Sequence, residues 1–128
     1  MGNPFCYVQL HTTDPERAKR FYGELLEWSF EEAPADKPAY AEIQVGEGTA
    51  GGMLKCATPE MPSHWLPFVL VTDVQASVGK ATELGATVVV QPTKVPGKGT
   101  YSVLVDPTGA SVALWQPASM EGNSDGAG

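Results

Sequence analysis

Three side chains near the start of the chain carry groups that bind or activate small molecules in other proteins. Tyr7, Gln9 and His11 alternate with apolar residues in the stretch YVQLH. This period of two is that of a strand, so the three side chains are expected on one face. An imidazole titrates near neutrality, which suits His11 to act as a general base or as a hydrogen-bond partner of a ligand. A structural histidine bonded to a turn fits the same position, so both roles stay open.

The second histidine of the chain, His64, stands beside Trp65 in the stretch MPSHW. Its register places it at the edge of the same site, and both a functional and a purely structural role stay open. The two cysteines, Cys6 and Cys56, have no CxxC motif and no neighbouring histidine, so we expect free thiols rather than a zinc site or a disulfide framework. No local Ser/His/Asp or Cys/His pattern indicates a nucleophile.

The predicted strand runs into a strong helix signal. Asp14 is suited to be the N-cap, Pro15 the first helical residue and Glu16 an acidic residue of the first turn. Apolar residues then recur at helical spacing, which predicts an amphipathic helix of about three turns with one buried face. The residues of this face are Ala18, Phe21, Tyr22, Leu25 and Leu26.

The same pattern is written a second time. Asp73 follows Asp14 by 59 positions (73 minus 14), again as the N-cap of an apolar helix pattern, which Gly85 ends. The segments that begin at Tyr40 and Tyr101 also align, at an offset of 61 (101 minus 40), and each reads as a strand, a glycine-containing turn and a strand. One further strand follows each helix, so each half predicts strand, helix, strand, strand, strand.

These halves predict an α+β fold in which two βαβββ modules form a curved mixed sheet around a cleft, with the helices outside. We expect a single domain over residues 1–117, with module one at about 5–58 and module two at about 64–117. The stretch MPSHW, Met61 to Trp65, is the expected connector because of its two prolines. Residues 118–128 are rich in Gly, Ser and Asn and are predicted to be a disordered tail.

Composition excludes several classes of partner. With 15 acidic and 8 basic residues the net charge is −7, so the chain has no basic stripe to bind nucleic acid. A membrane span needs roughly 18 consecutive apolar residues, and no such run occurs. A signal peptide begins with basic residues followed by an apolar stretch, and this pattern is not found in the sequence. A cytoplasmic protein is therefore expected.

The duplicated pattern, with DPERAKRFYGELLEW in the first half and DPTGASVALWQP in the last hairpin, resembles the vicinal oxygen chelate superfamily. That group includes glyoxalase I, extradiol dioxygenases and bleomycin resistance proteins. The resemblance covers about residues 5–117 and implies the cleft and pairing into a homodimer. Because such folds host lyases, epimerases, dioxygenases, thiol transferases and inert drug binders, the resemblance does not fix the function.

The resemblance also implies where a metal would be held. The four ligand positions of metal-dependent members correspond here to Tyr7, Gly52, Leu66 and Ala113. Only Tyr7 offers a donor atom, and its phenol is protonated at neutral pH. We therefore predict no metal and no cofactor, and we expect Gly52 and Ala113 to leave room in the cleft.

The strand faces that carry these positions are expected to line the cleft. Mostly apolar walls with a few polar side chains are typical of a small-molecule site. In the alternative interpretation the two sheets pack closely together, and the same residues form a core with no room for a ligand. The loop from Lys94 to Tyr101 either contacts a ligand, closes over it or is a plain hairpin. The predicted ligand-binding residues are Tyr7, Gln9, His11, Gly52, Leu54, Trp65, Leu66, Phe68, Leu70, Ala113 and Trp115.

Three functions follow, and whether the protein is an enzyme stays open. The leading hypothesis is a metal-free protein that binds an organic small molecule in the cleft between the modules. The second is a metal-independent isomerase or lyase that uses His11 or Tyr7 as acid or base. A metal-dependent lyase or dioxygenase is the third.

Overall fold

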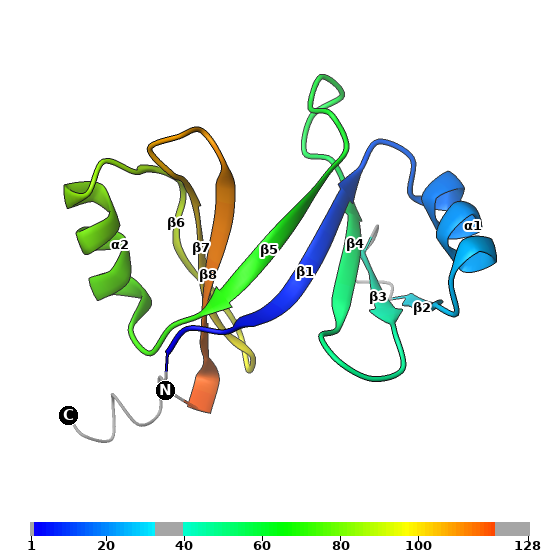
Figure 1. Cartoon of the computed structure of the whole chain (residues 1–128), viewed down its shortest axis with the longest axis horizontal. Coiled ribbons are helices and arrows are strands. Elements are labelled where there is room, and N and C mark those ends of the chain that lie inside the picture. Colours follow the sequence, from blue (N-terminus) through cyan, green and yellow to red (C-terminus); the bar gives the residue numbers. More distant parts are fainter. Residues whose placement is uncertain (1, 33–39, 120–128) are drawn as a thin grey trace. The chain divides into compact units, whose positions relative to one another are not determined.

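The computed structural model of the chain describes residues 2–32 and 40–119. It confirms the predicted repetition of strand, helix and three strands (Figure 1). The first set is β1 (Phe5–Thr12), α1 (Pro15–Leu25), β2 (Ser29–Glu32), β3 (Tyr40–Gln44) and β4 (Gly51–Lys55). The second set is β5 (His64–Leu70), α2 (Val74–Glu83), β6 (Thr87–Val95), β7 (Gly99–Val105) and β8 (Ser111–Pro117).

The described residues divide into two compact units. Module one comprises residues 6–67, and module two comprises residues 2–5 and 68–119. Strand β5 therefore begins in module one, with His64, and ends in module two, with Leu70. Neither α1 nor α2 has the length and apolar character needed to cross a bilayer.

The sheet of module one has the strand order β2-β3-β4-β1. β1 and β4 are parallel and the other pairs are antiparallel, which confirms the predicted mixed α+β arrangement. One face of the sheet packs against α1 around three buried side chains, Leu10, Ile43 and Met53. Because successive side chains of a strand point to opposite faces, the alternate residues of these strands lie on the face away from α1.

Helix α1 begins as predicted but is less buried than predicted. The Asp14 carboxylate accepts a hydrogen bond from the Arg17 backbone N–H at 3.1 Å, as an N-cap does. Tyr22 packs on the core, whereas Phe21 and Leu25 are 58% and 62% exposed. The expectation of one fully buried apolar face is therefore wrong, because the sheet meets only one side of the apolar stripe.

Module two repeats this design with the strand order β5-β8-β7-β6. Its core joins Val74 and Val78 of α2 to Val71 and Leu104. Asp73 caps α2 by accepting from the Ala76 N–H at 3.1 Å. Gly85 follows the helix with φ +103°, a left-handed conformation that glycine adopts without strain, so the predicted stop is confirmed.

The structure bears on the predictions for the connector, the Lys94–Tyr101 loop, the C-terminal tail and the cysteines. His64 and Trp65, predicted as part of the connector, already belong to β5. The Lys94–Tyr101 segment contains a tight hairpin turn, in which the Lys98 N–H donates to the Val95 carbonyl at 2.9 Å. Of the predicted tail, only residues 118 and 119 are described, and the remainder of 118–128 lies outside the described residues. Neither cysteine forms a disulfide with a described residue.

Candidate functional site

One face of the module-one sheet, the face turned away from α1, gathers most of the predicted polar residues. Gln9 is aligned with Gly52, which is aligned with Glu42, and His11 is aligned through Leu54 with Tyr40. Aligned residues of neighbouring strands point to the same side of a sheet. We name this surface the polar face; its residues are Tyr7, Gln9, His11, Tyr40, Glu42, Gly52 and Leu54.

The centre of the polar face is a pair of tyrosines above Gly52. The Tyr7 and Tyr40 hydroxyls are hydrogen-bonded to each other. A Cβ atom placed on Gly52 would collide with both hydroxyl oxygens and would lie 2.9 Å from Tyr40 Cζ. A side chain at position 52 would therefore have to push one or both phenols out of their places. The expectation that Gly52 leaves room is wrong, because the two phenols fill that space.

Both tyrosines are held in the neutral form. Burial raises the pKa of the Tyr7 phenol far above its usual value, and the hydrogen bond to Tyr40 and the negative charge of Glu42 add to the rise. Burial likewise raises the pKa of Tyr40, with a further contribution from Glu42. At physiological pH the pair consequently offers hydrogen-bond donors and acceptors, but no phenolate base.

Gln9 links this pair to His11. Its Oε1 lies 3.1 Å from His11 Nε2, and its side chain is also hydrogen-bonded to the Tyr40 hydroxyl in a way that lowers the pKa of Tyr40. An amide oxygen can only accept, so Gln9 Oε1 accepts from His11. His11 then carries its proton on Nε2, and Nδ1 holds a lone pair.

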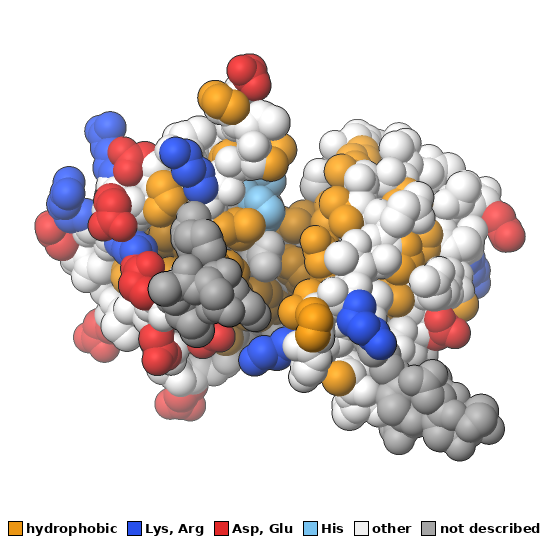
Figure 2. Space-filling view, turned by 180° about the vertical axis from the view of Figure 1, so that it is seen from behind, with side chains coloured by type: hydrophobic (Ala, Val, Ile, Leu, Met, Phe, Trp, Pro, Cys, Tyr) orange, Lys and Arg blue, Asp and Glu red, His pale blue; other side chains and the backbone are white. Residues whose placement is uncertain are grey.

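The two histidines are stacked at one end of the polar face. The rings of His11 and His64 have centroids 4.9 Å apart and an interplanar angle of 15°. His64 donates from Nδ1 to the Pro62 carbonyl at 2.9 Å. Burial lowers the pKa of His11, and His64 lowers it further, because two imidazolium charges would repel each other. Figure 2 shows histidine, in pale blue, reaching the surface among hydrophobic side chains.

Trp65 is not brought to this group. Its ring packs edge to face on Tyr22, with centroids 5.6 Å apart, and on Trp28 at 6.2 Å. Both partners belong to the apolar set around the α1-side core. Trp65 therefore lies on the opposite side of β5 from its neighbour His64. Leu66, the next residue, is buried.

The remaining predicted residues form an apolar set in module two. Phe68 is aligned with Ala113, and Leu70 with Trp115, on the strand face turned away from α2. Ala113 is completely buried and Phe68 is 5% exposed. The Trp115 ring lies over Gly99, where an added Cβ would be 2.8 Å from Cζ2. These contacts are those of a well-packed apolar surface.

The residues at the four positions that the resemblance assigns to metal ligands are poor ligands for a metal. Gly52 has no side chain, and the phenols of Tyr7 and Tyr40 occupy the volume that a ligand side chain at that position would need. Leu66 and Ala113 carry no donor atom and are buried. Among residues 2–32 and 40–119, no three His, Cys, Asp or Glu side chains converge as metal ligands do.

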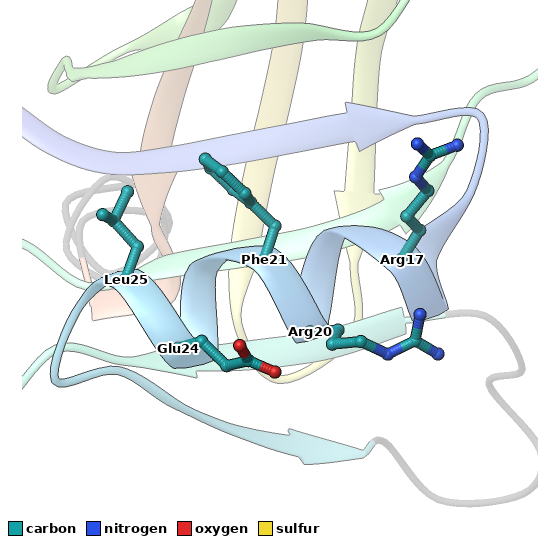
Figure 3. A pocket seen from close by; sticks show the side chains of 5 residues that line it. All are labelled: Arg17, Arg20, Phe21, Glu24 and Leu25. Carbon is teal, nitrogen blue, oxygen red and sulfur yellow. The ribbon is translucent and has the colours of Figure 1, made fainter.

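A separate depression of about 440 Å³ lies on helix α1. In Figure 3, Arg17, Phe21 and Leu25 extend to one side of the helix, and Arg20 and Glu24 extend to the other. None of these five residues was predicted to bind a ligand. The depression belongs to the α1 side of module one and shares no residue with the polar face.

The chain is similar to several curated proteins. It is 31% identical over 115 residues to a Mycobacterium tuberculosis protein named "Putative glyoxylase CFP32", a match that covers 88% of this chain and 44% of the relative. It is also 34% identical over 62 residues to the anthracycline biosynthesis protein DauV of Streptomyces sp. strain C5, covering 48% of this chain and 22% of that protein. The chain thus spans less than half the length of these curated relatives.

Solved structures show the same fold. A methylmalonyl-CoA epimerase from Mycobacterium tuberculosis matches with a TM-score of 0.62 and 13% identity, over 88% of this chain and 87% of the epimerase. An extradiol ring-cleaving dioxygenase from B. fuscum matches with a TM-score of 0.65 and 18% identity, over 88% of this chain and 32% of the enzyme. A family model described as the glyoxalase-like domain matches residues 7–115. The chain therefore belongs to the glyoxalase-like domain family of the vicinal oxygen chelate superfamily.

Proposed function

We propose that the protein binds an organic small molecule on the polar face of module one and that it does so without a metal. The observation that carries this proposal is the hydrogen-bonded row from Tyr7 through Tyr40 and Gln9 to His11. Small-molecule sites combine apolar walls with a few fixed polar groups, and this row fixes the direction of several donors and acceptors.

The metal-free part rests on the donor atoms. A divalent metal needs several converging nitrogen, oxygen or sulfur ligands, and the positions discussed above supply only a protonated phenol. The names of the curated relatives, a glyoxylase and a protein of anthracycline biosynthesis, are in keeping with small organic ligands. Ligand roles for Trp65, Leu66, Phe68, Leu70, Ala113 and Trp115 stay predictions, as do a homodimer and a cytoplasmic location.

A second function, a metal-independent isomerase or lyase, is favoured by the tautomer of His11. The lone pair on Nδ1 and the lowered pKa make a neutral imidazole that accepts a proton at physiological pH. The tyrosine pair would hydrogen-bond the oxygen of an enolate or of a leaving group. Tyr7 would not act as a base in this reaction, because its pKa is raised and the phenol stays protonated.

The binding proposal predicts which residues a bound ligand will contact. In a panel of metabolites and antibiotics screened by amide chemical shifts, binders should move the signals of Gln9, His11, Gly52 and Tyr40 in protein treated with EDTA. Replacing Tyr40 with Phe should weaken a binder by about three- to tenfold, since one hydrogen bond is lost. Binders that move only signals of Arg17, Arg20 and Phe21 on α1 would contradict this site.

The enzymatic alternative predicts a strong effect of His11→Ala. Removal of a general base lowers turnover by about a hundredfold or more, while ligand binding changes much less. Exchange of solvent deuterium into a carbonyl compound found in the panel, followed by mass spectrometry, measures this step. Arg20→Ala, on α1 and away from the polar face, is the control. Equal exchange by wild type and His11→Ala would exclude His11 as the base.

The lowered pKa of His11 predicts a dependence of stability on pH. The unfolded chain has the ordinary histidine pKa of about 6.5, so between that pH and the lower folded pKa the unfolded state binds more protons. The contribution of His11 to the free energy of unfolding is therefore complete above this window and is lost as the pH falls through it. In urea unfolding at several pH values, the free energy of unfolding of His11→Gln should fall less steeply with decreasing pH than that of the wild type. An NMR-titrated His11 pKa above 6.5 would contradict the burial described.

A further inference from the structure

We propose that the ligand of the polar face carries an organic ammonium group, which binds at the Glu42 carboxylate beside the rings of Tyr7 and Tyr40. This inference rests on the proposed function and specifies the chemical class of the ligand. It is carried by the position of Glu42, by the absence of a described cation near it, and by the neutral aromatic groups around it.

Glu42 belongs to the same structural group as the tyrosine pair. It follows Tyr40 by two residues on β3, so the two side chains share a face, and it is aligned with Gly52, the residue beneath both phenols. Its charge is close enough to raise the pKa of both Tyr7 and Tyr40. The Glu42 residue is exposed, so a ligand can reach it.

No basic side chain in the described part of module one neutralises Glu42. The ion pairs there join Lys19 to Glu16 and to Glu32. Lys19 and the two arginines lie on α1, on the opposite side of the sheet. Lys55 is aligned with the buried Thr12 and alternates with Leu54, which places it on the α1 side as well.

The neighbours of Glu42 suit a cation and not an anion. On β2, Glu31 is aligned with Glu42, and like charges directly opposite each other are unfavourable. The Glu31 carboxylate accepts a hydrogen bond from the Gln44 amide at 3.2 Å. Glu42 is the carboxylate that lies next to the tyrosines. An ammonium group would gain from the Glu42 charge and from the phenol oxygens as acceptors.

Benzylamine and benzyl alcohol provide a matched pair of probes, because they are similar in size and only the amine is charged at pH 7. Their dissociation constants are measured by amide chemical-shift titration of the full chain at low salt. We expect benzylamine to bind about tenfold more tightly than benzyl alcohol and to move the Tyr40, Glu42 and Gly52 signals. Glu42→Gln should reduce this preference to near one.

Glu24→Gln, on α1, is the control for net charge, since it makes the same change on the opposite side of module one. It should keep the preference, and amide spectra of both variants confirm that they fold. If both probes bind the polar face equally, the ammonium inference is overturned while the proposed function stands. Equal loss of the preference in Glu42→Gln and Glu24→Gln, or no shift of the polar-face signals by benzylamine up to about 50 mM, also overturns it.

Discussion

The contact of two phenols above Gly52 is the constraint on which the rest of the polar face depends. Because β4 carries no side chain at this point, Tyr7 of β1 and Tyr40 of β3 meet across it and hydrogen-bond to each other. Gln9 is hydrogen-bonded to Tyr40, and its Oε1 accepts from His11 Nε2. One absent side chain in the middle strand thus organises residues on both neighbouring strands.

The polar face carries different groups from those that the resemblance to metal-dependent proteins implies. The resemblance to the superfamily assigns metal ligands to the positions of Tyr7 and Gly52, whereas here these positions carry a neutral phenol and a glycine beneath it. A metal polarises an oxygen by its charge; hydrogen-bonded phenols act on the same kind of atom as fixed dipoles, with no charge of their own. The charged group of the polar face is instead the Glu42 carboxylate, which lies near both phenols.

Much of the architecture could be predicted from the sequence because its signals are local. Asp14 and Asp73 cap the two helices, and Gly85 ends the second, as their residue types require. The shared face of Tyr7, Gln9 and His11 follows from the period of a strand. Phe21 and Leu25 of α1 are more exposed than predicted. Periodicity shows which residues share a helix face, but it does not show how much of that face a sheet covers.

The rest of the site depended on alignment between strands, which no local pattern reveals. Tyr40 and Glu42 were missed, although the alternation of polar and apolar residues along β3 was a signal that they face away from the core. Trp65 was predicted to bind the ligand, although the period of two that places Leu66 and Phe68 on one face puts Trp65 on the other. With β5 starting at His64, Trp65 turns to the α1 side and His64 stacks on His11.

The most direct test of this account is a mutant cycle on the contact above Gly52. Gly52→Ala should lower the free energy of unfolding by about 1–3 kcal/mol, because the new methyl group displaces the phenols. With Tyr7→Phe and Tyr40→Phe already present, the cost should be at least about 1 kcal/mol smaller, since the colliding oxygens are gone. An equal cost of Gly52→Ala in both backgrounds, measured by urea unfolding, would contradict the account.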